Sequence, residues 1–195
     1  MPKLVASLQG QQVVQVSAGD FHSLALVRGG DVYSFGAGSF GRLGHGNQLN
    51  QLLPKLIAAL QGTRVVQVSA GQMHSLALAE GGEVYSFGRG RHGQLGHGDV
   101  EDQLVPTLIP ATATRQGRVV EVAAGARWSL LLQEDGEVAS LGSGRAEPRE
   151  GDGGWLDGML DGLAEGLARW RSFNVQPQLS RLGDVVTNSL SRQAY

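Results

Sequence analysis

Histidine and serine stand side by side at two equivalent places in the chain, and such a pair could supply a general base and a nucleophile. The pairs are His22–Ser23 and His74–Ser75. A base activates a nucleophile only when the two side chains lie within hydrogen-bond reach. Both pairs fall in segments where polar and apolar residues alternate, which is typical of strands, and adjacent side chains of a strand point to opposite faces. Hydrolase chemistry within these pairs is therefore not predicted.

Metal binding is a second chemistry that the histidines could support. There are five of them: His22, His45, His74, His92 and His97. A metal site needs three or four converging ligands. His22 and His74, and likewise His45 and His97, recur at equivalent positions of a repeat and should lie on separate sheets, and His92 stands alone. Trp128 replaces histidine at the third equivalent position. We therefore interpret His22 and His74 as half-buried imidazoles that bond to the backbone at the start of a strand, and we expect neither a metal nor a cofactor.

Two segments match the glycine pattern G-x-G-x-x-G of nucleotide-binding loops, at residues 36–41 and 88–93. A phosphate site of this kind needs a helix that begins at the loop, because the helix N-terminus supplies free N–H groups and a favourable dipole. The glycine-rich residues that follow cannot start a stable helix. The pattern therefore favours structural turns over a nucleotide site.

The elements that carry all these residues belong to an internal repeat. Residues 2–47 align without a gap with residues 54–99, at an offset of 52, and a third, degenerate copy runs from Pro106 to Gly144. The repeat region therefore spans residues 1–144, with units at about 2–53, 54–105 and 106–144. Repeated units of this length indicate a solenoid or a propeller.

Each unit contains short runs with a period of two, which predict about four strands. The 30 glycines of the chain mark the turns between them. We expect positive φ angles where a glycine pair joins two strands as a tight hairpin. The glycines predicted to form structural turns are Gly29, Gly30, Gly36, Gly41, Gly81, Gly82, Gly88 and Gly93.

Three motifs of the repeat resemble the RCC1 family, whose repeats are named after the regulator of chromosome condensation. They are Val-x-Val-x-Ala-Gly-x-x-His-Ser-Leu-Ala-Leu (14–26 and 66–78), Gly-x-Val-Tyr-Ser-Phe-Gly (30–36 and 82–88) and Gly-x-Leu-Gly-His-Gly (41–46 and 93–98). The resemblance covers about residues 2–144. It implies an all-β fold, here an incomplete β-propeller of about three four-stranded antiparallel blades.

The resemblance also implies a set of functions. Such propellers serve as protein-docking surfaces, as guanine-nucleotide exchange factors for small GTPases and as domains of large ubiquitin ligases. We predict a protein–protein interaction scaffold that is not an enzyme. The alternatives are an exchange factor for a small GTPase and a fragment of a larger RCC1-repeat ubiquitin ligase. The expected partners are proteins, including a small GTPase or a ubiquitin-pathway protein.

Variation between the near-identical units points to the loop tips as the binding surface. The framework residues stay the same while the residues after each Ala-Gly and within each Gly-x-Gly loop change. Loops that vary on a rigid scaffold are typical of recognition, although neutral drift at exposed sites would give the same pattern. The residues predicted to bind a partner are Asp20, Phe21, Phe40, Arg42, Gln72, Met73, Arg89, Arg91, His92 and Arg127.

The repeat pattern ends at Gly144. Residues 145–154 are polar and rich in glycine, as in a linker, and apolar residues over 155–195 recur at helical spacing, which predicts an α-helical tail. An acidic stripe on this tail, Asp157, Asp161 and Glu165, argues against a membrane span. Three blades leave uncovered apolar faces, so we expect the tail or a second chain to cover one of them, which predicts a homodimer.

Charge and composition restrict the partners and the compartment. The chain has 16 basic and 18 acidic residues and no cysteine. A nearly balanced charge lacks the basic surface of a nucleic-acid-binding protein, so direct nucleic-acid binding is not expected. The absence of cysteine fits a reducing compartment. We therefore expect an intracellular protein, cytoplasmic or nuclear.

Overall fold

The computed structural model describes residues 4–114 and 117–142, and all of them belong to a unit that spans Met1–Gly144. The predicted linker (145–154) and helical tail (155–195) lie outside the described residues. Within the described part, no helix is long and apolar enough to cross a membrane.

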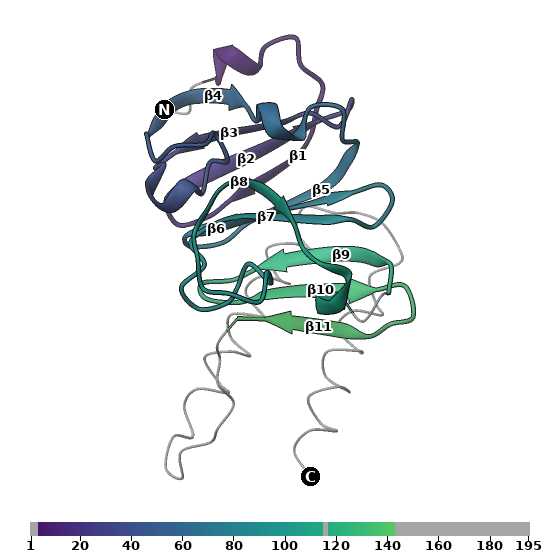
Figure 1. Ribbon diagram of the computed structural model, residues 1–195. Coiled ribbons are helices and arrows are strands. Elements are labelled where there is room, and N and C mark those ends of the chain that lie inside the picture. The colour runs from purple at the N-terminus through teal and green to yellow at the C-terminus, as the bar shows by residue number, and fades with distance from the viewer. Residues whose placement is uncertain (1–3, 115–116, 143–195) are drawn as a thin grey trace, which may run out of the picture. The chain divides into compact units, whose positions relative to one another are not determined.

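Eleven described strands form three antiparallel sheets that follow one another along the chain (Figure 1). The first sheet has the order β1 (Val13–Ala18), β2 (His22–Val27), β3 (Val32–Gly36) and β4 (Gln51–Leu56). The second repeats this order with β5 (Val65–Ala70), β6 (His74–Ala79), β7 (Val84–Gly88) and β8 (Gln103–Leu108). The third contains β9 (Val119–Ala124), β10 (Ser129–Gln133) and β11 (Val138–Leu141). We call these sheets blades 1, 2 and 3.

Blade 3 has three strands within the described residues. Short 3₁₀ turns precede the first strand of each blade or follow its third: η1 (Ala6–Leu8), η2 (Ser39–Gly41), η3 (Ala58–Leu60) and η4 (Ala111–Thr114). The predicted all-β architecture of about three blades is confirmed.

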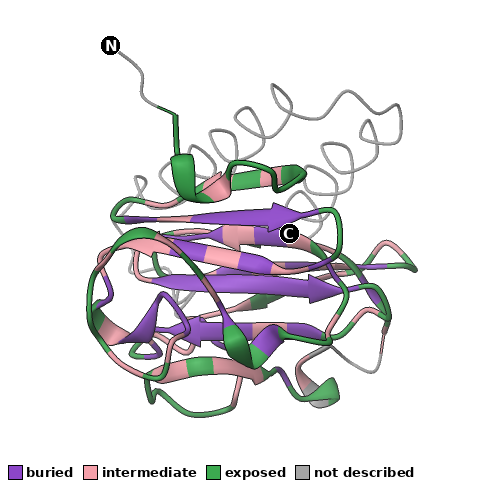
Figure 2. Ribbon diagram, turned by 90° about the horizontal axis from the view of Figure 1, so that it is seen from above, coloured by how far each residue is buried: buried purple, intermediate pink, exposed green. Residues whose placement is uncertain are grey.

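The hydrophobic core lies between the blades. One cluster joins Leu24 and Leu26 of β2 to Val65 and Val68 of β5. The next cluster joins Leu76 and Leu78 of β6 to residues of β9 and β10. In Figure 2 the buried stretches of the strands are drawn in purple. Leucine and valine alternate with small residues along these strands, so each sheet presents one apolar face to each neighbour.

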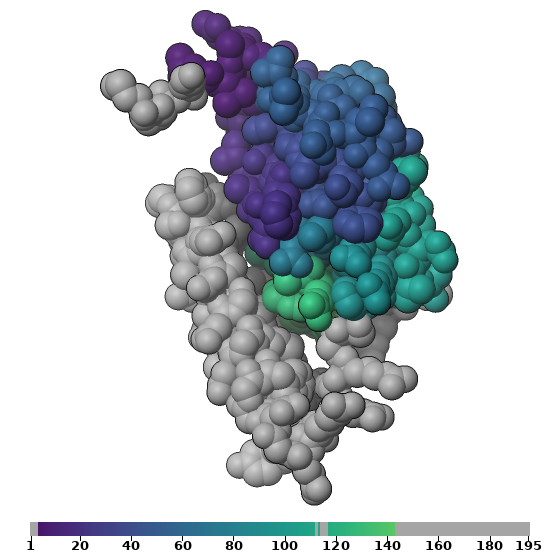
Figure 3. Space-filling view, turned by 90° about the vertical axis from the view of Figure 1, so that its left-hand side faces the viewer, coloured from purple at the N-terminus to yellow at the C-terminus, as the bar shows by residue number. Residues whose placement is uncertain are grey.

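The first face of the stack is open. Val16 of β1 is 64% exposed, whereas the equivalent Val68 and Val122 are 1% and 3% exposed, because the preceding blade covers them. The space-filling view shows the chain order as successive colours, from purple at β1 through blue to teal and green (Figure 3). Among the described residues, therefore, none covers the valine face of blade 1, whereas the equivalent faces of blades 2 and 3 are buried.

The β2–β3 and β6–β7 hairpins correct one part of the glycine prediction. Gly30 and Gly82 have φ angles of 96° and 99°, as expected, but Gly29 and Gly81 are not in the left-handed region. The N–H of Gly30 donates to the carbonyl of Val27 (2.9 Å). In such a three-residue loop only the last residue needs positive φ, so the first glycine of each pair is not required by the backbone.

Replacing Gly30 with valine should lower the free energy of unfolding by about 1–3 kcal/mol, because a β-branched residue is strained at positive φ. A Cβ there would also lie 3.0 Å from the backbone of Arg64 and Val65 in blade 2. Gly29→Val is the matched control, since nothing lies within 4 Å of its added Cβ. Urea unfolding of both variants measures the difference, and equal midpoints would contradict this account of the hairpin.

Candidate functional site

Histidine and serine do meet in this protein, but across blade junctions instead of along a strand. His22 Nε2 lies 2.8 Å from Ser75 Oγ, and His74 Nε2 lies 2.8 Å from Ser129 Oγ. All four residues are buried. The prediction of half-buried imidazoles that bond to the backbone was therefore wrong, because the next blade covers each ring and supplies a side-chain partner.

The hydrogen-bond directions at these junctions determine what the pairs can do. Ser75 Oγ donates to the carbonyl of Arg42 and Ser129 Oγ donates to the carbonyl of Gln94, both at 2.8 Å. Each serine must therefore accept a hydrogen bond from Nε2–H of its histidine. Burial is the main cause that lowers the pKa of His22 to about 4 and of His74 to about 3. A neutral imidazole that donates to a buried serine cannot act as its base, so these pairs join blades.

Glutamine side chains make a second connection between blades. Gln15 Nε2 donates to the carbonyl of Val68 (3.0 Å), and the Val68 N–H donates to Gln15 Oε1 (2.9 Å). Gln67 makes the same two bonds to Val122, at 3.0 and 2.9 Å. Glu121 occupies the equivalent position of blade 3, where burial raises the pKa of its carboxyl to about 7.

Replacing Glu121 with glutamine should raise the melting temperature at pH 8, on the order of 3 °C. The folded-state pKa is raised, so burial of the charged form destabilises the protein at high pH, and this cost disappears as the pH falls below about 5. Thermal unfolding at pH 8 and pH 5 measures the effect, with the exposed Glu101→Gln as control. A gain that is equal at both pH values would show that charge burial is not its cause.

The loops at one end of the blades bring the predicted binding residues together. The Ala37 N–H donates to the carbonyl of Phe21 and the Arg89 N–H donates to the carbonyl of Met73, both at 2.9 Å. These bonds hold the loop between the first two strands of a blade against the loop after its third strand. We call this end the loop face. It carries all ten residues predicted to bind a partner.

Arg42 fills the loop face between blades 1 and 2. Its guanidinium donates to the carbonyl of Gln72 (3.4 Å) and contacts Met73 Sδ (3.0 Å). It also lies 5.6 Å from the ring centroid of Phe21 and 5.8 Å from that of Phe40. Next to it, Gln72 Nε2 donates to Asp20 Oδ2 at 2.9 Å. The side chain of Arg42 is buried, so it closes this junction instead of presenting its charge to a partner.

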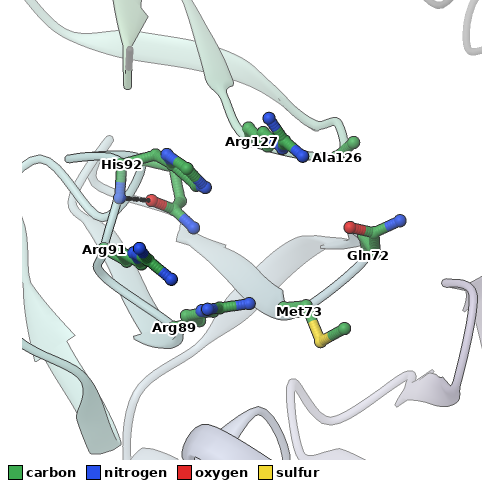
Figure 4. Close-up of a pocket in the computed structure, with 8 residues that line it drawn as sticks. Gln72, Met73, Arg89, Arg91, His92, Ala126 and Arg127 are labelled. Atoms are coloured by element: carbon green, nitrogen blue, oxygen red, sulfur yellow. Dashed lines mark hydrogen bonds between the residues drawn. The ribbon is translucent and has the colours of Figure 1, made fainter.

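The equivalent position between blades 2 and 3 leaves a hollow. Gln94 replaces Arg42 there, and its Oε1 accepts a hydrogen bond from the His92 N–H (2.8 Å) within its own loop. A pocket of about 370 Å³ remains beside it (Figure 4). Eight residues line this pocket: Gln72, Met73, Arg89, Arg91, His92, Gln94, Ala126 and Arg127. We call it the junction pocket.

The junction pocket is strongly basic. Arg89, Arg91 and Arg127 line it, and no acidic residue does. In the described part of the chain, the ion pairs join Arg64 to Glu80 and Arg118 to Glu134 and involve none of these three arginines. Partial burial and then the positive charges of Arg127, Arg89 and Arg91 lower the pKa of His92. The pocket therefore concentrates positive charge that the described residues do not neutralise.

Phe40 connects the two junctions and has a strained backbone. Its φ angle of 63° makes it the one non-glycine residue with positive φ among those described. The Gln48 side chain accepts a hydrogen bond from the Phe40 N–H (3.1 Å), and the Arg89 guanidinium lies 4.6 Å from the centroid of its ring. Left-handed non-glycine residues cluster at binding sites, where the surrounding structure maintains the strain.

The G-x-G-x-x-G segments form turns. Gly36, Gly41, Gly88 and Gly93 have positive φ angles between 74° and 111°. The element found at the first segment is the 3₁₀ turn η2. A Cβ on Gly88 would lie 2.6 Å from the Met73 carbonyl oxygen, so this glycine is needed where two loops cross.

Two residues of the junction pocket were not among the predicted binding residues. Ala126 varies between repeats in the same way as Asp20 and Gln72, so repeat variation was a sufficient signal for it. Gln94 is buried and stands where the first unit has Arg42, so repeat variation marks this position too. The pocket depends on how the shorter side chain packs, which repeat variation alone does not reveal.

Family models decide the relationship of the chain to known proteins. Two models described as the regulator of chromosome condensation (RCC1) repeat match it, one at residues 29–78 and 81–132 and the other at 13–42 and 65–94. The chain belongs to the RCC1 repeat family. Its three sheets are consecutive blades of an RCC1-type β-propeller.

Individual RCC1-repeat proteins support the assignment. The ultraviolet-B receptor UVR8 of Arabidopsis thaliana is 45% identical over 74% of this chain and 32% of the receptor. The human E3 ubiquitin-protein ligase HERC2 is 43% identical over 73% of this chain and 3% of the ligase. The crystal structure of Prp20p from Saccharomyces cerevisiae superposes with a TM-score of 0.57 and 27% identity, covering 78% of this chain and 35% of Prp20p. The chain thus spans at most 35% of the length of each of these proteins.

Proposed function

We propose that this chain is an interaction module that binds protein partners through its loop face and is not itself an enzyme. The observation that carries the proposal is the loop face, which carries the ten variable residues; six of them line a basic pocket that has no acidic lining residue. The relatives support it, since the Prp20p structure is described with binding properties to Gsp1p and histones. The buried histidine–serine pairs serve the blade junctions, because a neutral imidazole that donates to a serine cannot act as its base.

Comparative affinity capture tests the proposal. The double variant Arg91→Gln/Arg127→Gln removes two exposed charges from the loop face, and Arg28→Gln/Lys55→Gln removes two exposed charges elsewhere. We expect a set of proteins from cell extract to bind the wild type and the second variant but not the first. If both variants retain the same proteins and circular dichroism shows both folded, the loop face is not the binding site.

A second candidate is a guanine-nucleotide exchange factor for a small GTPase, and a third is a segment of a larger ubiquitin ligase. The family supports both, through Prp20p and HERC2. The rate at which a panel of small GTPases releases a fluorescent guanine nucleotide distinguishes an exchange factor from a passive scaffold. Acceleration that is lost in the Arg91→Gln/Arg127→Gln variant would favour exchange activity over simple docking.

We also propose that the open valine face of blade 1 takes part in a homodimer, with a reducing compartment, cytoplasmic or nuclear, as the setting. The exposure of Val16 supports the dimer, because the same position is buried wherever a blade precedes it. Sedimentation equilibrium of the chain and of Val16→Asp tests it. A dimer that the aspartate disrupts is expected, and a wild-type monomer at micromolar concentration would contradict it.

A further inference from the structure

The two blade junctions of the loop face differ in what occupies them. Between blades 1 and 2, the buried Arg42 side chain extends across the junction to Gln72 and Met73. Between blades 2 and 3, the shorter Gln94 bonds to its own loop, and the space that an arginine would fill is open. The junction pocket is thus the space that an arginine side chain occupies in the equivalent junction between blades 1 and 2.

The charged groups around this space are all positive, so they repel one another and favour an anion. Three guanidinium groups surround it and, among the described residues, no carboxylate pairs with them. Arginine side chains donate paired N–H groups that match carboxylate and phosphate oxygens, and clusters of arginine recognise acidic and phosphorylated motifs. Bringing an anion into the pocket would also relieve the repulsion between the three charges.

The pocket is partly organised before any ligand arrives. The Arg89 guanidinium packs over the Phe40 ring at 4.6 Å, and the Phe40 N–H donates to Gln48 Oε1 at 3.1 Å, which fixes the backbone that carries the ring. Arg91 and Arg127 come from the loops of blades 2 and 3, on opposite sides of the hollow (Figure 4). Prior restriction of a side chain reduces the entropy that binding must overcome.

The loop face provides apolar contacts in and beside the pocket. Met73 lines the hollow, and Phe21, which packs against Arg42 at the adjoining junction, is 54% exposed. A peptide that places a charged residue in the hollow could therefore lay apolar neighbours on these side chains. Such a mixed surface suits a peptide better than a uniformly charged polymer.

We propose that the junction pocket binds an anionic side chain, a glutamate or aspartate carboxylate or a phosphorylated residue, in a peptide segment of the partner. The inference rests on the proposed function, because it assigns the chemistry that the loop face recognises. It makes Arg89, Arg91 and Arg127 the specificity-determining residues.

Fluorescence anisotropy with labelled peptides tests the inference. Four peptides share Gly-Ser flanks and an adjacent leucine and differ at the centre, with consecutive glutamates, glutamines, one phosphoserine or one serine. We expect the glutamate and phosphoserine peptides to bind at least about tenfold more tightly than their neutral counterparts, with affinity falling as salt is raised. Competition by inorganic phosphate and by free glutamate shows which oxygen group the pocket prefers.

Single variants identify the residues responsible. Arg91→Gln and Arg127→Gln should each lower the affinity for the anionic peptides about fivefold or more, whereas Arg28→Gln, at an exposed position, should leave this affinity unchanged. Proton NMR of the His92 ring gives an independent readout. Its pKa should rise when an anionic peptide binds, because a neighbouring negative charge stabilises the imidazolium form.

Three outcomes would overturn the inference. They are equal affinity for charged and neutral peptides, anionic binding that Arg91→Gln and Arg127→Gln leave unchanged, and tighter binding of a single-stranded oligonucleotide of equal charge. A different result is that the anionic peptides show no preferential binding while the Arg91→Gln/Arg127→Gln variant still captures fewer proteins than the wild type. In that case the loop face remains the binding site, and only the proposed ligand chemistry is wrong. If the capture difference is also absent, the proposed function fails as well.

Discussion

Replacing Gly71 with valine is expected to lower the free energy of unfolding by about 3 kcal/mol and to loosen the junction between blades 2 and 3. Gly71 lies in the loop between β5 and β6, where its added Cβ would collide with the carbonyl oxygen of Gly125 in blade 3. The same Cβ would come within 2.9 Å of His74 Nδ1. A larger side chain must therefore push apart two backbones and displace the histidine that bonds to Ser129.

Urea unfolding measures the size of the effect, and hydrogen exchange locates it. Amides of β9 and β10 should lose protection in Gly71→Val, while those of β1 and β2 keep most of theirs. Ala126→Val is the control, because it adds the same kind of side chain to an exposed position of the corresponding loop. If Gly71→Val unfolds at the same urea concentration as the wild type, the blades do not approach as closely as described.

Acid should destabilise the protein between pH 6.5 and pH 4, and protonation of Glu121 offsets only part of the loss. The pKa values of His22 and His74 are lowered to about 4 and about 3, so below pH 6.5 the unfolded chain takes up protons that the folded chain cannot. The stabilising contribution of the neutral imidazoles is thus present above pH 6.5 and lost as the pH falls. For two buried groups the loss by pH 5 is on the order of 3 kcal/mol.

The double variant His22→Gln/His74→Gln isolates this contribution. It should be less stable at pH 7, because two buried contacts change, but its stability should depend much less on pH over this range. His45, His92 and His97, whose pKa values are also lowered, remain in both proteins. Parallel pH profiles for wild type and variant would mean that other groups cause the acid sensitivity.

The sequence predicted the blades because the repeat and the period of two are local patterns. Strands β2 and β6 fall where Leu24 and Leu76 alternate with smaller residues, and the hairpin glycines mark their ends. The histidine–serine contacts could not be predicted in this way. His22 and Ser75 are 53 positions apart, so their contact depends on how one sheet packs against the next.

The loop face was predicted in part because variation between the repeats can also be read from the local sequence. Repeat variation identified Arg89, Arg91 and Arg127, because each replaces a different residue in the other units. Whether a long side chain turns inward or outward depends on the space available between blades. Arg42 was predicted to face a partner and lies buried instead, whereas its repeat equivalent Gln94 bonds within its own loop and leaves the pocket open.

Photo-crosslinking from the junction pocket tests the central claim most directly. A photoreactive amino acid is placed at Ala126, an exposed pocket residue, or at Gly29, in the hairpin at the opposite end of blade 1. The account predicts discrete protein adducts from position 126 that disappear when Arg91 and Arg127 are changed to glutamine, and none of these adducts from position 29. The same adducts from both positions, or adducts from position 29 alone, would contradict the assignment of the loop face as the protein-binding surface.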